Sequence, residues 1–405
     1  MTNIEDIKQT LKQLEDAKEE AEMILRSILL PVLVTSKSTR KIVYANKYAE
    51  RQYETKLEDI IGSHIDSLYS MEGQQEHIIE ALKTKGYVDN FEEMFVTRSG
   101  KQFVALLSVI PIKYHGEDCY IGMVTDITKQ KDVEKELRDV NKHIQDSINY
   151  ASLIQEALMP DEFLFNSYFK DHFVIWEPKD IVGGDIYLAT QLNDNEIIIM
   201  VIDCTGHGVP GAFVTMLVKA VERQIASILL SNSFIQASPS WILTYFNQTI
   251  KTLLKQDQED SSSNAGFDGG VLYYNKSENL VKFSGAKTDL FYFDDKDEGK
   301  VRIIKGSRQS IGYKKSDTDF MFEEHEFYLE NNMKFYITTD GFLDQNGGEK
   351  GFPLGKKRFV KILEKIYHNP MKEQKEILQS ELKKYQNSYK RNDDITFIGL
   401  DIEIS

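Results

Sequence analysis

The spacing of hydrophobic residues changes several times along the chain. Within residues 1 to 28, apolar side chains such as Ile7, Leu11, Leu25 and Ile28 recur at intervals of three and four, and charged residues cover the other faces. This spacing predicts an amphipathic or coiled-coil helix over residues 3–28. Such a helix either packs on its own domain or forms the seam of a dimer, and both interpretations fit the pattern.

Residues 29–127 have the pattern of a small α+β domain. Two short strand-like runs, LLPVLVTS and KIVYAN, are followed by polar helical segments, including residues 73–86. Three longer strand-like runs come next: FEEMFVTR, KQFVALLSVIPIKY and CYIGMVTDIT. Ser99-Gly100 and His115-Gly116 are expected to form the turns between them.

Residues 128–162 contain the most regular repeat in the sequence. Apolar or small side chains alternate at intervals of four and three, through Val133, Leu137, Val140, Ile144, Ser147, Ala151, Ile154 and Leu158. A repeat of 3.5 residues predicts a coiled-coil linker, which ends before Pro160. The linker is either a rigid spacer or a device that transmits a change in helix crossing.

Residues 163–405 alternate strand-like runs with helical ones. Short turns join most of the neighbouring strands, which favours antiparallel sheets over a doubly wound parallel sheet. The polar segment Lys255–Gly270 is predicted to be a loop. The expected fold class is therefore multidomain α+β.

Composition narrows the function. The chain has 49 basic and 64 acidic residues, a net charge of −15, which disfavours nucleic-acid binding. Its two cysteines, Cys119 and Cys204, can form neither a disulfide framework nor a zinc cluster. The N-terminus has no signal-peptide pattern, and the apolar runs are too short for a membrane span. A cytoplasmic protein without membrane partners is expected.

Aspartates recur at predicted strand ends. Asp185 lies in KDIVGGDIY, Asp203 in VIDCTGHG and Asp340 in YITTDGF, while Asp393 and Asp394 lie in KRNDDITFIGL. One such aspartate alone is most simply a turn or a helix cap. Several together predict a site for Mg²⁺ or Mn²⁺, because hard cations take oxygen ligands. Two such ions can activate a water and clamp a phosphoryl group.

The first α+β segment resembles a PAS domain, through IVYAN, RSGKQF and GMVTDITKQK. The resemblance implies a sensor or dimerisation domain, and its ligand is unknown. A domain without a cofactor is favoured over one that binds haem through His64 or His77. No flavin-adduct motif surrounds Cys119.

The C-terminal segment resembles the SpoIIE-type serine/threonine phosphatases of the PPM (protein phosphatase 2C-like) superfamily. The matching motifs follow the family order: IVGGDIY, DCTGHGVPGAF, GFDGGVL, FSGAKTDLFYF, RQSIG, TTDGFLDQNGGEKG and NDDITFIGL. The resemblance implies an α-β-β-α sandwich with two mainly antiparallel sheets over residues 163–405. It also implies hydrolysis of phosphoserine or phosphothreonine by a metal-bound hydroxide, without a phosphoenzyme.

The resemblance also assigns roles to individual residues. It makes Asp203 the metal-bridging carboxylate and the backbone carbonyl of Cys204 a further ligand. Asp185 and Asp340 are the other metal ligands with catalytic roles. Either Asp393 or Asp394 is the last ligand, and the sequence leaves this choice open.

Typical partners of the family are phosphorylated STAS-type anti-sigma factor antagonists, and the cofactors are two Mn²⁺ or Mg²⁺ ions. A homodimer through the PAS domain and the coiled coil is expected. We further expect the end of the linker to pack on the helix over residues 211–230, beside the metal site.

The sequence departs from the family pattern in one loop. Lys287 and Asp289 replace the residue types usual for the family, so substrate contacts in that loop are expected to differ.

Two other functions were compared with hydrolysis. A non-catalytic scaffold that binds a phosphoprotein is the alternative function. The segment GGDIY also resembles the diguanylate cyclase signature, but Ile186 stands where that signature needs an acid.

Overall fold

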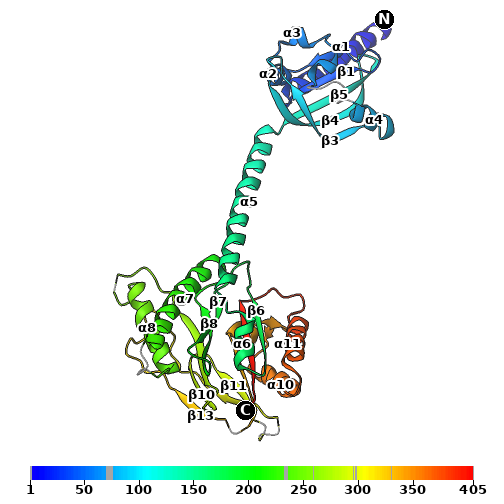
Figure 1. Ribbon diagram of the computed structural model, residues 1–405. Helices are drawn as coiled ribbons and strands as arrows, with labels where there is room; N and C mark the ends of the chain where they lie inside the picture. The colour runs from blue at the N-terminus through cyan, green and yellow to red at the C-terminus, as the bar shows by residue number, and fades with distance from the viewer. Residues whose placement is uncertain are drawn as a thin grey trace. The chain divides into compact units, whose positions relative to one another are not determined.

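The computed structural model describes residues 2–69, 76–231, 236–258, 260–294, 296, 299–329 and 331–404. The chain divides into two compact units, Met1–His143 and Ile144–Ser405 (Figure 1). The division falls within helix α5, Thr128–Ala157. Within the described part of the chain, no helix is long and apolar enough to cross a membrane.

The first unit contains a five-stranded antiparallel sheet in the order β2-β1-β5-β4-β3. Its strands are β1 (Val32–Ser36), β2 (Ile42–Ala45), β3 (Val88–Val96), β4 (Gln102–Tyr114) and β5 (Glu117–Asp126). The helices are α2 (Lys47–Tyr53), α3 (Leu57–Ile60), the 3-10 helix η1 (Ile65–Leu68) and α4 (Glu76–Thr84). Both predicted hairpins are confirmed, and residues 73–75 of the predicted helical segment lie outside the described residues.

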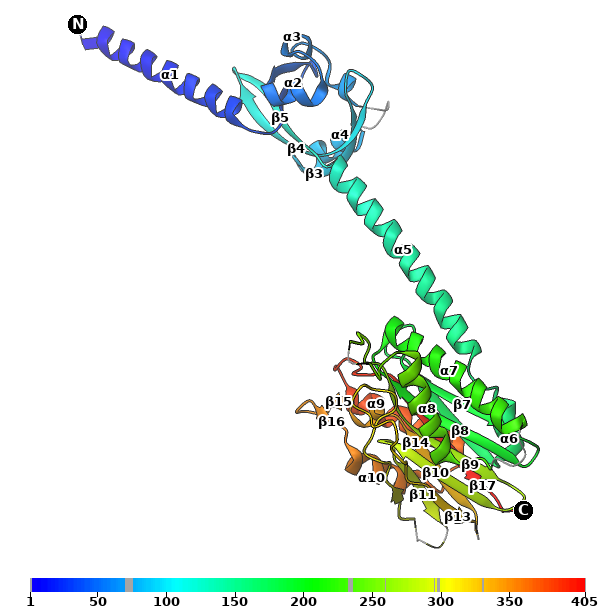
Figure 2. The ribbon, with the colours of Figure 1, turned by 90° about the vertical axis from the view of Figure 1, so that its left-hand side faces the viewer.

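Two long helices flank the sheet in the sequence, and Figure 2 shows both as uninterrupted. Helix α1 spans Thr2–Ser27, as its spacing predicts, and α5 forms the predicted helical linker. Leu137 and Ile144 on the predicted seam of α5 are 58% and 52% exposed in the single chain. The seam is therefore available for a second helix, and the coiled coil itself stays a prediction.

The second unit has four layers, helices–sheet–sheet–helices, visible in Figure 1. One sheet has the order β13-β10-β9-β8-β7 and the other β12-β11-β14-β17-β6. Their strands are β6 (Asp171–Glu177), β7 (Asp185–Gln191), β8 (Glu196–Cys204), β9 (Phe267–Asn275), β10 (Leu280–Ala286), β11 (Leu290–Asp294), β12 (Arg302–Ile304), β13 (His325–Tyr328), β14 (Met333–Thr338) and β17 (Ile395–Ile402). All strand pairs within these sheets are antiparallel, which confirms the expected fold class.

The helices of this unit cover the two outer faces. Helices α7 (Gly208–Ser231) and α8 (Pro239–Leu253) pack on the first sheet, and α10 (Lys356–Ile366) and α11 (Met371–Gln386) pack on the second. Shorter elements complete the unit: α6 (Glu162–Tyr168), α9 (Asp340–Leu343), β15 (Asn346–Gly347) and β16 (Phe352–Pro353). A third apolar core lies between the sheets and contains Ile199, Val201 and Leu272.

The predicted loop Lys255–Gly270 extends too far. Strand β9 begins at Phe267, because this segment pairs with β8 on one side and β10 on the other. Gly269 allows the close pairing, since a Cβ there would lie 2.7 Å from the Val201 carbonyl oxygen. Local composition favours a loop, but pairing on both sides makes the segment a strand.

Candidate metal centre and active site

Three aspartates lie side by side across three strands. Asp203 near the end of β8 is paired with Asp185 at the start of β7 and with Asp268 on β9. Directly opposed residues of antiparallel strands have Cβ atoms about 5 Å apart on the same face of the sheet. The pairing therefore forms a row of three carboxylates with Asp203 in the middle.

This row lies at one end of the layer between the two sheets. Side chains alternate along a strand, so Asp203 faces the same way as Ile199 and Val201. Those two residues belong to the core between the sheets. The carboxylates thus continue the inter-sheet layer beyond its apolar part, where side chains from the second sheet can reach them.

The second sheet contributes two more aspartates from neighbouring strands. Asp340 is the first residue of α9, separated from β14 by Thr339, and Asp393 lies just before β17. Burial raises the pKa of Asp203 well above its usual range, and the carboxylates of Asp185, Asp340, Asp393 and Asp268 raise it further. Strand ends distant in sequence therefore meet in one acidic cluster.

Asp394 has a different environment from Asp393. Its two carboxylate oxygens accept backbone hydrogen bonds from Lys179 and Gly184, both at 2.6 Å, and the side chain is only 3% exposed. Burial raises the pKa of Asp394, and these two hydrogen bonds oppose the shift. Asp394 thus holds the loop that leads into Asp185.

Glycines bring three segments of the site into close contact. The carbonyl oxygen of Gly206 would lie 2.1 Å from a Cβ at Gly184 and 2.2 Å from a Cβ at Gly211. Any side chain at either glycine would separate the loop before Asp185 from the turn after Asp203. Cys204 is buried at this junction, and its backbone N–H donates to the Gly184 carbonyl at 3.0 Å.

Thr339 positions one of the carboxylates. Its hydroxyl donates to Oδ2 of Asp185 at 2.7 Å and accepts from the backbone N–H of Thr396 at 2.9 Å. Thr339 is buried and directly precedes Asp340. A hydrogen bond of this kind fixes a metal ligand's orientation, and sequence reasoning did not single out this residue.

The C-terminal end of α5 contacts the same region. The amide of Gln155 donates to the Gly183 carbonyl at 2.8 Å and to the Thr215 hydroxyl at 3.0 Å, and it accepts from the Gly183 N–H at 3.1 Å. Gln155 is fully buried, and Leu158 packs against the core under α7. The expected packing of the linker end on α7 is confirmed.

Sequence reasoning also did not assign Asp268, which fell within the predicted loop. Its Oδ1 is buried and has no hydrogen-bond partner among the described residues, while its Oδ2 lies 3.6 Å from the Lys287 ammonium. Lys287 adopts a positive φ of 54°, and its backbone N–H donates to the Ser307 carbonyl at 2.7 Å. Only the position of Asp268 opposite Asp203 reveals its place in the row.

His207 lies in the turn after Asp203. Its Nδ1 is 2.8 Å from Oδ2 of Asp180, and both side chains are about half exposed. The His207 ring therefore contacts the loop between β6 and β7, which contains Asp180.

The donor set suits a hard divalent cation. All five cluster carboxylates supply oxygen, the ligand that Mg²⁺ and Mn²⁺ prefer. The buried, unpartnered Oδ1 of Asp268 is an acceptor that a cation would satisfy. Among the described residues, no three acidic, histidine or cysteine side chains converge at ligand distance.

Comparison with known families identifies the architecture. The family profile described as Stage II sporulation protein E (SpoIIE) matches residues 193–403, just over half of the 405 residues. The chain belongs to the SpoIIE family. A PAS-domain profile matches residues 29–129, so in this SpoIIE protein a PAS domain precedes the PP2C-type phosphatase domain.

The chain is also similar to individual proteins. Phosphoserine phosphatase RsbP of Bacillus subtilis (strain 168) is 19% identical over 419 residues, which cover 89% of this chain and 95% of RsbP. The solved SiaA-PP2C domain of Pseudomonas aeruginosa is 34% identical with a TM-score of 0.57, covering 65% of this chain and 99% of that domain. A structure of RsbX in complex with magnesium is 18% identical with a TM-score of 0.38, covering 57% of this chain and 93% of RsbX.

Proposed function

We propose that this protein is a metal-dependent serine/threonine phosphatase that acts on a phosphorylated partner protein, a STAS-type anti-sigma factor antagonist. The row of Asp185, Asp203 and Asp268 carries the proposal, together with membership of the SpoIIE family. RsbP, which is similar over most of its length, is named a phosphoserine phosphatase. These observations favour hydrolysis over the alternative of a scaffold that only binds a phosphoprotein.

In this proposal, the cluster residues are the ligands of two Mn²⁺ or Mg²⁺ ions. Asp203 would contact both ions, because it lies between the carboxylates of Asp185 and Asp268. Asp340 and Asp393 would complete the set from the second sheet, and the Cys204 carbonyl would be a further donor. When bound, the ions would supply Lewis acidity toward a phosphate ester and a water.

Charges beside the cluster support a phosphorylated substrate. An open groove of about 670 Å³ adjoins the site, and its only charged lining residues among those described are Lys287, Arg308 and Lys315. Lys287 is also ion-paired with Asp268. A basic groove in a chain of net charge −15 would attract a phosphorylated, acidic segment and direct it to the carboxylates.

The decisive experiment separates hydrolysis from binding alone. Incubation of the full chain and Mn²⁺ with a phosphoserine-bearing STAS protein should remove the phosphoryl group. Intact-mass spectrometry of the STAS protein measures this loss. Asp203→Asn should abolish this loss. Asp194→Asn, in the exposed turn at the far end of the β7–β8 hairpin, should leave it unchanged. Binding of the phosphoprotein without any loss of phosphate would favour the scaffold instead.

A further inference from the structure

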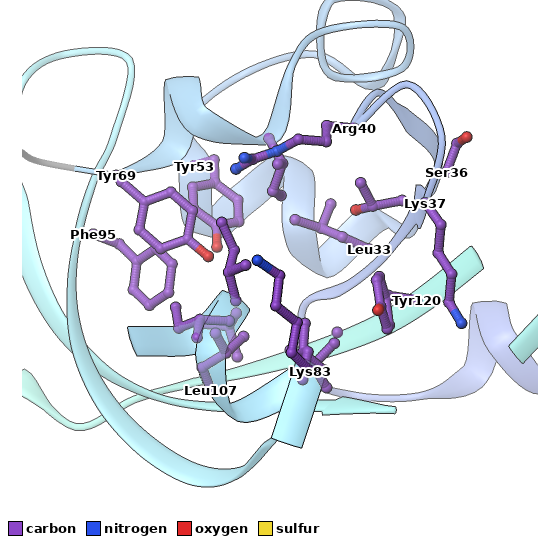
Figure 3. A pocket seen from close by; sticks show the side chains of 18 residues that line it. Leu33, Ser36, Lys37, Arg40, Tyr53, Tyr69, Lys83, Phe95, Leu107 and Tyr120 are labelled. Atoms are coloured by element: carbon purple, nitrogen blue, oxygen red, sulfur yellow. The ribbon is translucent and has the colours of Figure 1, made fainter. Parts of the chain in front are cut away.

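The PAS domain contains a partly open cavity of about 270 Å³, shown in Figure 3. Much of its wall is apolar and comes from both the sheet and α4, including Leu33, Ile78, Phe95, Leu107, Val109 and Val124. A cavity of roughly 150 Å³ lined by similar side chains binds benzene. The PAS cavity therefore has room for a ligand of roughly ten non-hydrogen atoms.

A buried hydroxyl in this wall has no hydrogen-bond partner among the described residues. Tyr53 is 1% exposed, and its hydroxyl has no hydrogen bond to any described residue. Burial raises the pKa of Tyr53, and the nearby Tyr69 raises it further, so the hydroxyl stays protonated and can donate. A buried donor without an acceptor is costly, which favours a ligand that supplies one.

Among the described residues, those with a charge that line the cavity are all basic: Lys37, Arg40 and Lys83. Two of them are already engaged, since Arg40 pairs with Asp66 and the Lys37 amine lies 4.6 Å from the centre of the Tyr120 ring. Lys83 has no ion pair or hydrogen bond within the described part of the chain. Figure 3 shows its amine turned into the cavity.

We propose that the PAS cavity binds a small organic acid with an apolar body and a carboxylate head. The body fills the apolar interior, and the carboxylate accepts hydrogen bonds from the Lys83 ammonium and the Tyr53 hydroxyl. The two donors are the buried Tyr53 hydroxyl and the charged ammonium of Lys83, a solvent-exposed residue, and together they recognise a carboxylate over a neutral amide of equal size. This site is separate from the acidic cluster and does not depend on the phosphatase proposal.

The cavity lining does not suit haem or a flavin that forms a cysteine adduct. Neither His64 nor His77 lines it, and His64 instead contacts Asp66 at 2.9 Å. Cys119 is buried on β5 but is also absent from the lining. The available side chains thus favour an organic anion over haem ligation or a cysteine adduct.

Calorimetric titration of the full chain with octanoate, 3-phenylpropionate and octanamide tests the proposal. At least one acid should bind the wild type, and octanamide should bind at least about tenfold more weakly than octanoate if the alkyl acid fits. Lys83→Met keeps the apolar stem and should lower affinity for the bound acid by about tenfold or more. Tyr53→Phe should lower it several-fold without loss of thermal stability, because the hydroxyl bonds to none of the described residues.

Lys85→Met is the matched control, since Lys85 is exposed just beyond α4 and does not line the cavity. This variant should bind the acids as the wild type does. The proposal is overturned if neither acid binds, if octanoate binds but octanamide binds as tightly, or if Lys83→Met keeps full affinity for the bound acid. A thermal unfolding curve for each variant separates lost binding from lost folding.

Discussion

Asp393 and Asp394 are adjacent in sequence but have different roles. The carboxylate of Asp394 accepts two backbone N–H groups. Burial raises the pKa values of Asp203 and Asp340, and the carboxylate of Asp393 raises both further. The pKa of the buried Asp185 is raised by both neighbours, by Asp394 more than by Asp393. The hydrogen bonds of Asp394 stabilise a loop. The position of Asp393 near the other carboxylates is what a shared cation site requires. The sequence left open whether Asp393 or Asp394 is the last metal ligand, and these contacts favour Asp393.

Exchange of each aspartate for asparagine should separate these roles. Asp394→Asn turns an amide toward backbone donors and should lower the free energy of unfolding by about 1–3 kcal/mol. Asp393→Asn removes a repulsive charge and should leave stability unchanged or slightly higher, while it weakens Mn²⁺-dependent phosphate release. Thermal unfolding without metal and a phosphate-release assay provide the two readouts. The reverse pattern would assign the ligand to Asp394.

Thr339 offers a second test at this scale. Thr339→Val keeps the shape but removes the hydrogen bond to Asp185, and loss of such a supporting bond costs about 10–100-fold in metal affinity. The Mn²⁺ concentration that gives half-maximal activity should rise accordingly. Thr339→Ser retains a hydroxyl and should restore most of the affinity. An unchanged Mn²⁺ dependence in Thr339→Val would show that the bond does not position the ligand.

The site residues that the sequence predicted share a local signal. Asp185, Asp203 and Asp340 each adjoin both a hydrophobic run and a glycine, a pattern visible without the fold. Asp268 was not singled out because the polar run before it predicted a loop, and its register opposite Asp203 places it in the row. Strand pairing is a non-local property, so local composition predicted a loop there.

At the level of elements, the end of α5 is fastened to the site. Gln155 makes three hydrogen bonds, to both backbone groups of Gly183 and to Thr215 on α7. The heptad pattern could not predict this contact, because Gln155 lies outside the predicted apolar seam. A shift of the linker would displace the loop that leads into Asp185, which supports the hypothesis that the linker regulates the site.

Gln155→Ala should therefore weaken metal-dependent activity from a distance. It leaves buried polar groups at Gly183 and Thr215 unpaired, at a cost of about 1–3 kcal/mol, and frees the loop before Asp185. The Mn²⁺ concentration for half-maximal activity should rise several-fold. Gln145→Ala, on an exposed part of the same helix, is the control and should behave as the wild type. Equal Mn²⁺ dependence of both variants would remove the coupling.

At the level of the whole molecule, we predict a parallel dimer through α5. Val133, Leu137, Val140 and Ile144 are all about half exposed along one seam, and a second copy of the helix would cover them. Leu137→Glu together with Ile144→Glu should yield a monomer in light scattering. Lys135→Glu together with Lys142→Glu has the same spacing on exposed positions and should remain dimeric. A monomeric wild type at micromolar concentration would contradict the prediction.

The central claim is that the acidic cluster binds divalent cations and uses them to hydrolyse a phosphate ester. Phosphate release from a phosphoserine protein, measured against Mn²⁺ concentration for the wild type, Asp203→Asn and Asp268→Asn, tests it most directly. The account predicts saturable activation in the wild type, no activity in Asp203→Asn and a large loss in Asp268→Asn. Release that is independent of metal, or that survives in Asp203→Asn, would contradict the account.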